Sequence, residues 1–248
     1  FNKSIPSLSP LSNLTSTIAR SGNFLSISFT AWSYNVLVNI AWWNLLLFSA
    51  NDEEYGQELW ISNGNAKQTK IAADINPGKQ SSSPSDVLIQ GDNAYFSADD
   101  GRTGHELWNY SLKENKASLV RNINTNTGIG SNPSELTALN GQFVFAAKGN
   151  AYGRELWISD GTRSGTTLLK DINPGGLDSN PEDLSTLNGD IYFTSNTYFN
   201  GRQILKLNGN NLSVTELVNS SSEYTALEPD DLHSSDDQLF YSALTSTQ

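Results

Sequence analysis

The chain of 248 residues contains no cysteine, and this absence removes three classes of site at once. Without cysteine there is no disulfide framework, no thiolate zinc site and no cysteine nucleophile. Packing and hydrogen bonds must therefore hold the fold together. The length allows one or two domains, and one all-β domain of this size is ordinary.

Positive charge is also scarce. The chain has 15 Lys and Arg against 26 Asp and Glu, which gives a formal net charge of −11. Nucleic acids and anionic membrane surfaces attract basic patches, so neither is expected as a partner of this acidic chain. Charged residues make up 17% of the chain and aromatic residues 10%, which is typical of a folded, β-rich protein rather than of a disordered acidic tail.

Long hydrophobic runs are missing as well. The most apolar stretch, residues 36–50, is interrupted by Asn39 and Asn44. It is shorter than the roughly 18 consecutive apolar residues that a membrane-spanning helix needs, so we interpret it as two adjacent buried strands and expect no membrane insertion. Residues 1–4 lack the basic and apolar segments of a signal peptide, which we interpret as a sign of a processed or trimmed product.

The sequence does contain an internal repeat. The pattern Gly-x-Glu-Leu-Trp occurs three times, with spacings of 48 and 49 residues between Trp60, Trp108 and Trp157. A degenerate fourth copy begins at Gly201, which lies 48 residues after Gly153. A short apolar element precedes each copy and occurs five times, beginning at residues 47, 95, 144, 192 and 240.

Each repeat unit contains several short strand patterns. Asn140-Gly141 joins two of them in the third unit, and Asn-Gly favours a tight hairpin because both residues take positive φ. Proline ends strand pairing, so it marks the boundaries between units at Pro84, Pro133, Pro181 and Pro229. The four strand patterns of the third unit are residues 135–139, 142–147, 155–159 and 166–172.

Four antiparallel strands in every 48 or so residues predict the blade of a β-propeller. We therefore predict an all-β fold, in which residues 1–248 form a single five-bladed β-propeller domain of four-stranded antiparallel blades. The fifth blade combines strands from both chain ends, a closure that removes exposed sheet edges. The predicted blades are residues 36–75, 83–123, 132–172, 180–218, and 231–243 together with 14–30.

The best-preserved copy resembles the bacterial ELWxxDGT repeat family. Residues 155–162 read Glu-Leu-Trp-Ile-Ser-Asp-Gly-Thr, and Lys-Asp-Ile-Asn-Pro-Gly follows at 170–175. The resemblance covers about residues 36–243. The family is seen mainly in secreted or surface proteins of cyanobacteria and myxobacteria. The resemblance therefore implies a bacterial protein with an extracellular, cell-surface or periplasmic location, and it implies an architecture more than an activity.

The repeated glutamates and tryptophans form the first candidate site. The carboxylates could accept hydrogen bonds from sugar hydroxyls while the indoles stack on sugar rings. We favour a structural role instead, because a Trp between blades buries a large apolar area and a buried Glu can accept backbone N–H groups. The ligand-binding candidates are Glu58, Trp60, Glu106, Trp108, Glu155 and Trp157.

Acids that recur once per repeat form the second candidate site. If the innermost strands bring these carboxylates together, the negative charges repel one another. A Ca²⁺ ion, protonation, or hydrogen bonds to the backbone at the start of each blade could offset this repulsion. We favour the hydrogen bonds, and apart from this possible Ca²⁺ we expect no cofactor. Acidic loops around Asp52 and Asp99 offer other oxygen ligands, although without EF-hand spacing. The candidate metal ligands are Asp86, Glu135, Asp183 and Asp231.

Catalytic motifs are absent: the sequence has no Gly-x-Ser-x-Gly elbow, phosphate-binding loop or His-Glu-x-x-His helix. Catalysis uses unlike residues with separated pKa values, whereas these acids repeat. We therefore expect a non-catalytic secreted or cell-surface binding or scaffold module, which contacts a protein or a glycan or belongs to a larger surface assembly. The alternatives are a glycan-binding lectin with repeated sites and a propeller enzyme acting on carbohydrate.

Overall fold

The computed structural model of the chain describes residues 17–21, 24–28, 35–40, 45–198, 200–217 and 228–244. These residues form an all-β structure of twenty strands, with one 3₁₀ turn at Ala66–Gln68. Every strand pair in this part of the chain is antiparallel, and no helix there is long and apolar enough to cross a membrane.

Four of the sheets have four strands each, and in each of them consecutive strands of the chain pair as a meander. The first sheet contains β3 (Asn35–Ile40), β4 (Leu45–Asp52), β5 (Gly56–Ser62) and β6 (Lys70–Ala73). The second contains β7 (Ser85–Gln90), β8 (Asn93–Asp99), β9 (His105–Ser111) and β10 (Lys116–Arg121). The third contains β11 (Ser134–Leu139), β12 (Gln142–Lys148), β13 (Arg154–Ser159) and β14 (Thr167–Lys170). The fourth contains β15 (Glu182–Leu187), β16 (Asp190–Thr197), β17 (Gly201–Leu207) and β18 (Val214–Glu216).

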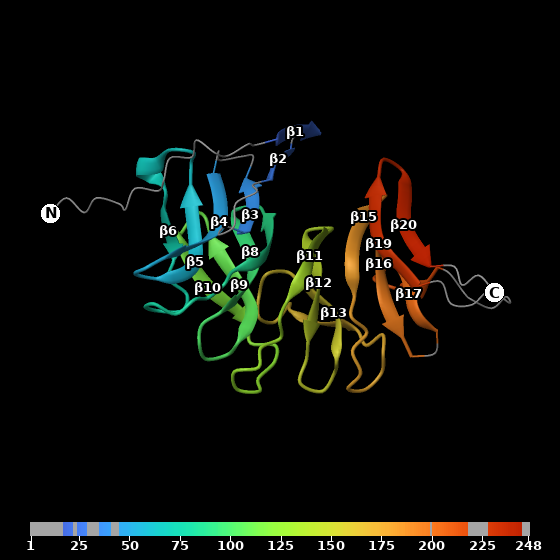
Figure 1. The fold of residues 1–248 in the computed structure, drawn as a ribbon. Helices are drawn as coiled ribbons and strands as arrows, with labels where there is room; N and C mark the ends of the chain where they lie inside the picture. Colours follow the sequence, from blue (N-terminus) through green and yellow to red (C-terminus); the bar gives the residue numbers. More distant parts are fainter. Residues whose placement is uncertain are drawn as a thin grey trace.

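The first strands of successive sheets lie side by side. Strand β3 contacts β7, β7 contacts β11, and β11 contacts β15, so the sheets follow one another around a common inner side (Figure 1). This arrangement is propeller-like, and it confirms the predicted all-β fold with four-stranded antiparallel sheets.

The strands near the two chain ends form two separate two-stranded sheets. One contains β1 (Thr17–Ser21) and β2 (Phe24–Ser28), and the other contains β19 (Glu228–Ser235) and β20 (Gln238–Leu244). Strand β2 contacts β3 whereas β19 contacts β15, and the two hairpins lie at opposite ends of the row of sheets (Figure 1). Each hairpin contacts the four-stranded sheet next to it in sequence, and the described residues show no sheet that combines the two hairpins, so the predicted closed fifth blade is not confirmed.

The hydrophobic core is divided among the interfaces between sheets. Leu47 and Leu59 of the first sheet pack with Phe96 and Tyr110 of the second. A second cluster joins the second and third sheets, and a third joins the third and fourth. The second and third sheets therefore bury both faces against neighbouring sheets, in agreement with the continuous apolar character of their second strands.

The hairpin turns follow from their sequence. Asn140 and Gly141 have φ values of 47° and 81°, and Asn188 and Gly189 have values of 53° and 82°. Both residues of each pair are left-handed, as a tight Asn-Gly turn requires. These turns fix the register of β11 on β12 and of β15 on β16.

The linkers between sheets cross closely over the first residue of the repeat motif. A Cβ atom on Gly153 would lie 2.0 Å from the carbonyl oxygen of Leu177, and one on Gly104 would lie 2.6 Å from the amide nitrogen of Gly130. The glycine of Gly-x-Glu-Leu-Trp is therefore needed for this close approach of backbone to backbone.

Gly153→Ala should lower the free energy of unfolding by about 1–3 kcal/mol, because the added methyl group collides with the linker backbone. Gly176→Ala is the matched control, since a Cβ atom there meets nothing within 4 Å. The control should change stability by less than about 0.5 kcal/mol. Urea unfolding of both variants measures the difference, and equal midpoints would show that the linker does not constrain Gly153.

Candidate functional site

The repeated glutamates lie inside the molecule and hold the linkers between sheets. Glu106 is completely buried. Its carboxylate accepts hydrogen bonds from the backbone N–H of Ile123 at 2.8 Å, the N–H of Asn124 at 3.1 Å and the hydroxyl of Ser131 at 2.6 Å. Because Ile123 follows β10 and Ser131 precedes β11, one carboxylate fixes both ends of the linker. We call this arrangement the glutamate clasp.

The clasp recurs in the first and third sheets. Glu58 accepts from the N–H groups of Ile75 and Ser82, both at 2.9 Å. Glu155 accepts from the N–H of Ile172 at 2.7 Å and from the hydroxyl of Ser179 at 2.7 Å. The clasp therefore explains why the repeat needs Glu in its third strand and Ser two residues before Pro.

Each clasped serine also joins the next sheet. The carbonyl oxygen of Ser131 accepts the N–H of Lys148 at 2.8 Å, and that of Ser82 accepts the N–H of Asp99 at 3.0 Å. The amide of Asn124 donates to the carbonyl of Gly130 at 2.9 Å and braces the same linker. One buried carboxylate thus connects two neighbouring blades through the linker.

Burial raises the pKa of each clasp glutamate above its ordinary value of about 4.5, while the hydrogen bonds that the carboxylate accepts oppose this shift. For Glu155 the nearby charge of Asp171 raises the pKa further. The hydrogen bonds are necessary because an unpartnered buried carboxylate would be costly.

Trp108 and Trp157 belong to the packing between sheets, whereas the ring of Trp60 lies near that of Phe48 in its own sheet. Trp157 is 6% exposed, and its indole N–H donates to the carbonyl of Ala147 at 3.0 Å. Trp60 and Trp108 are half-buried, and Trp108 packs against the cluster between the first and second sheets. With Glu58, Glu106 and Glu155 completely buried, the structure does not present the Glu and Trp pairs as open sugar sites.

The recurring acids lie at β-bulges in the innermost strands. The strand register shifts at each of them, for example between Ser134 and Thr137. A bulge redirects a side chain, and it lets these residues leave the regular pleat. All four are left-handed, with φ values of 53° for Asp86, 63° for Glu135, 57° for Asp183 and 53° for Asp231.

Two of these acids accept hydrogen bonds from the following blade. Asp86 Oδ1 accepts the N–H of Glu135 at 3.3 Å, and Glu135 Oε2 accepts the N–H of Leu184 at 3.2 Å. Burial raises the pKa of Glu135, and the charges of Asp183 and Asp86 add to this effect. Hydrogen bonds to the start of the next blade, which the sequence favoured, thus occur at these two positions.

No three His, Asp or Glu side chains are arranged to hold a metal ion within residues 45–198, 200–217 and 229–243. The described side chains therefore give no support to a Ca²⁺ site at Asp86, Glu135, Asp183 and Asp231 or at the acidic loops.

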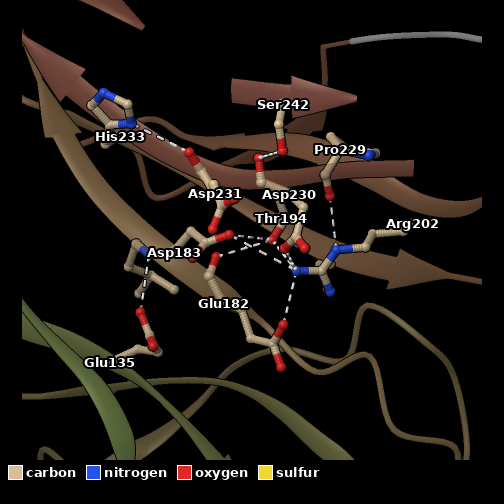
Figure 2. A network of polar contacts seen from close by, with 12 residues as sticks. Glu135, Glu182, Asp183, Thr194, Arg202, Pro229, Asp230, Asp231, His233 and Ser242 are labelled. Carbon is tan, nitrogen blue, oxygen red and sulfur yellow. Dashed lines mark hydrogen bonds and ion pairs between the residues drawn. The ribbon is translucent and has the colours of Figure 1, made fainter. Parts of the chain in front are cut away.

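Two arginines that the sequence analysis did not single out lie among these acids. Arg202 donates from Nη2 to Glu182 at 2.8 Å and to Thr194 at 2.7 Å, and from Nε to the carbonyl of Pro229 at 2.8 Å (Figure 2). Its Nη2 also lies 3.5 Å from Asp230 Oδ1 and 3.9 Å from Asp183 Oδ2. Arg202 therefore ties β17 to β19 across the junction of the last two sheets.

Arg154 occupies the same position in the preceding repeat. It donates from Nη1 to the carbonyl of Asn132 at 2.6 Å and from Nη2 to the hydroxyl of Ser134. Burial lowers the pKa of Arg154, whereas the charges of Asp86 and Glu135 oppose this shift. The available sequence signal was the variable residue of Gly-x-Glu-Leu-Trp, which is Gln57, His105, Arg154 and Arg202 in the four copies.

These charges form one group, which we call the inner-strand cluster. Its five carboxylates and two guanidinium groups leave three formal negative charges at the inner side of the sheets. Both arginines are engaged by protein groups, so the cluster can attract a cationic group but does not offer a free anion site. Its members are Asp86, Glu135, Arg154, Glu182, Asp183, Arg202 and Asp230.

No protein-family profile matches the chain, and no curated protein matches it. Among solved structures, a chain from a study of two prolyl endopeptidases matches with a TM-score of 0.56 and 12% identity, over 85% of this chain and 32% of that chain. A puromycin-hydrolysing peptidase from Mycobacterium tuberculosis matches with a TM-score of 0.53 and 11% identity, over 83% of this chain and 32% of the other. A puromycin hydrolase matches with a TM-score of 0.51 and 12% identity, over 79% of this chain and 31% of that chain.

The chain spans about a third of the length of the peptidases that it matches. At this identity the likeness shows a shared propeller-like fold. Our expectation that the chain is not an enzyme is wrong, because its structural neighbours are peptidases. The expectation relied on motifs missing from 248 residues, and that absence is no test of catalysis in a fold that occurs within much longer enzymes.

Glu106→Gln should lower the free energy of unfolding at pH 7 by about 1–3 kcal/mol. The amide replaces one acceptor oxygen by an NH₂ group, which cannot accept a hydrogen bond from a linker N–H. The control is Glu114→Gln, which changes an exposed glutamate on the same sheet. Thermal and urea unfolding measure both variants, and a clasp variant as stable as the control would contradict the role of Glu106.

The clasp also predicts a pH dependence. The pKa of Glu106 is higher in the folded than in the unfolded state, so the folded state holds more protons in the window above about 4.5. The stabilisation is complete below that pH and is lost as the pH rises through the folded pKa. The stability difference between wild type and Glu106→Gln should therefore narrow as the pH rises from about 4, and a gap that widens would contradict the raised pKa.

Proposed function

We propose that this chain is a propeller-type binding module of a secreted or cell-surface bacterial protein. It contacts its partner through loops that differ from one repeat to the next. The observation that carries this proposal is the complete burial of Glu58, Glu106 and Glu155. The polar side chains that repeat are used inside the fold, so ligand contacts fall to the residues that do not repeat.

A protein partner fits this division better than a glycan bound at repeated sites. A repeated lectin needs equivalent exposed side chains in each blade. The large exposed apolar residues of the described loops are not present in every repeat: Ile129 and Leu177 share a position at which the first linker has Gln80. A glycan-binding lectin remains the alternative.

Membership of the ELWxxDGT repeat family is part of the proposal, and packing around the third copy supports it. Asp160 accepts hydrogen bonds from the backbone N–H and the hydroxyl of Thr162 at 2.8 and 2.7 Å. Gly161 has a φ of 85°, and a Cβ atom there would collide with Tyr95 of the preceding sheet. The Asp-Gly-Thr loop thus has a packing role between blades, as a motif of architecture would.

We further propose that the two terminal hairpins join as a fifth blade. Phe240 and Tyr241 are 44% and 45% exposed, whereas Phe96 and Phe145 in the corresponding element of complete blades are fully buried. A half-blade lacks the strands that would cover these side chains, and apart from β19 and β20 themselves the described strands outside the four-stranded sheets are β1 and β2.

The lack of cysteine makes this closure testable. In the double variant Ala19→Cys with Ala243→Cys, a short bis-maleimide should produce an intramolecular cross-link, which mass spectrometry of peptides identifies. Ala243→Cys with Ser118→Cys is the control, since Ser118 lies on the outer strand of the second sheet. Equal yields from both pairs would contradict the closure.

The binding proposal predicts a protein ligand. The folded chain should give no more signal on a broad glycan array than a heat-unfolded sample, and the native protein should co-purify with a stoichiometric protein partner. A lectin with several equivalent pockets would instead bind multivalently to the array. Array binding would replace the protein ligand by a glycan, and the absence of both kinds of ligand would contradict the proposed function.

A further inference from the structure

Large apolar side chains are exposed along one side of the propeller. They lie in the loops between second and third strands and in the linkers between sheets, which Figure 1 shows along its lower edge. We call this surface the linker face, and define it by residues 52–55, 74–84, 99–104, 122–133, 148–153 and 171–181. Ile129 is 59% exposed, Leu177 51% and Tyr152 40%.

The loops and linkers of this face form a continuous row. Gly104 packs against the backbone of Ile129 and Gly130, and Gly153 packs against the backbone of Leu177. Between them, Thr125 and Asn150 exchange two hydrogen bonds, at 2.8 and 2.6 Å. Linker and loop therefore alternate in contact, and this order places Tyr152 between the linkers that carry Ile129 and Leu177.

The row is held in place before any partner binds. The glutamate clasps of Glu106 and Glu155 fix both ends of the two linkers, and the carboxyl group of Asp178 lies 3.5 Å from the ammonium group of Lys148. A preformed surface loses little conformational entropy on binding, which favours affinity.

The repeat shows that these apolar residues are not needed by the fold. Ile129 and Leu177 stand two residues before the clasped serines, and Gln80 stands at the same place before Ser82. The backbone of all three positions crosses the motif glycine in the same way. Gln80 shows that a polar residue is compatible with this close approach of the linker backbone to the motif glycine. The exposed Ile129 and Leu177 therefore have another explanation.

The linker face is acidic beside this apolar row. The loop of the first sheet carries Asp52, Glu53 and Glu54, and that of the second carries Asp99 and Asp100. The loops and linkers continue from these acids to the apolar row, since the Asn76 side chain packs against Gly101 and the Gly56 backbone against Gln80. A partner complementary to this face has basic residues next to apolar ones.

We propose that the linker face binds a protein segment in which aromatic or aliphatic side chains adjoin a cluster of Lys or Arg. This inference rests on the proposed function and names the surface and the chemistry of the partner. The apolar side chains of the segment pack on Ile129, Tyr152 and Leu177, while its basic side chains face the acidic loops. Apolar contacts set the lifetime of the complex, and the charges set its rate of formation.

A library of random twelve-residue peptides displayed on phage tests the proposal with the full chain as target. Enriched peptides should combine aromatic or aliphatic residues with Lys or Arg. Ile129→Ser with Leu177→Ser should weaken binding of a selected synthetic peptide by about tenfold or more, mainly through faster dissociation. Gln80→Ser is the matched control at the equivalent position and should change binding by less than about twofold.

A charge variant tests the other half of the surface. Glu53→Gln with Glu54→Gln should slow association of the same peptide at low salt, and this difference should shrink as salt screens the charges. Circular dichroism and the unfolding midpoint show whether each variant is folded, and these exposed substitutions should leave both unchanged.

The outcomes separate this surface from the proposed function. Selected peptides that bind the Ile129→Ser, Leu177→Ser variant as well as wild type would overturn the linker face, while the proposed protein-binding function would stand. Enrichment of acidic or purely polar peptides would overturn the proposed partner chemistry. If no peptide is enriched, the linker face is overturned as a peptide site, and the co-purification experiment decides the proposed function independently.

Discussion

The structure depends on a carboxylate buried between strands and linkers. A glutamate without partners in that place would be costly, and the backbone N–H groups of the linker would be equally unsatisfied without an acceptor. In the clasps of Glu58, Glu106 and Glu155 the linker N–H groups donate to the carboxylate, so both the donors and the acceptor are satisfied. The same interaction sets the path of the linker, the approach of Gly153 to Leu177 and the position at which the next sheet begins.

This constraint divides the chain into two kinds of residue. The repeating Glu, Ser, Asn and Gly are occupied by the connection between blades, and the tryptophans by packing. The exposed side chains of the linkers can differ from one repeat to the next, because the buried clasp glutamates fix the backbone at both ends of each linker. A fold of this kind combines a rigid frame with a variable face, which agrees with the occurrence of propeller-like structures in proteins of different activity.

Much of the fold could be predicted from the sequence, because period and turn chemistry are local signals. The spacing of the tryptophans gave the four-stranded units, and Asn140-Gly141 gave a hairpin that the structure contains. The period also located Asp86, Glu135, Asp183 and Asp231, but it could not show that each lies in a left-handed bulge. Arg154 and Arg202 were missed because they occupy the variable position of the motif, where repetition gives no signal. The arrangement of the terminal hairpins depends on contacts between distant segments, which no local pattern specifies.

The fourth copy of the motif differs from the others in a way that changes the physics of its junction. Gln203 stands where the earlier copies have Glu, and its amide nitrogen donates to the carbonyls of Asn200 and Arg202. Arg202 meets Asp230 of β19 across the same junction and Glu182 of β15 within its own sheet, and the side chains of these acids are 69% and 52% exposed. Exposed ion pairs are screened by salt, whereas hydrogen bonds to a buried carboxylate are screened much less. Ionic strength should therefore act unevenly on this molecule, weakening the ion pair between Arg202 and Asp230 while the buried glutamate clasps between the four sheets change little.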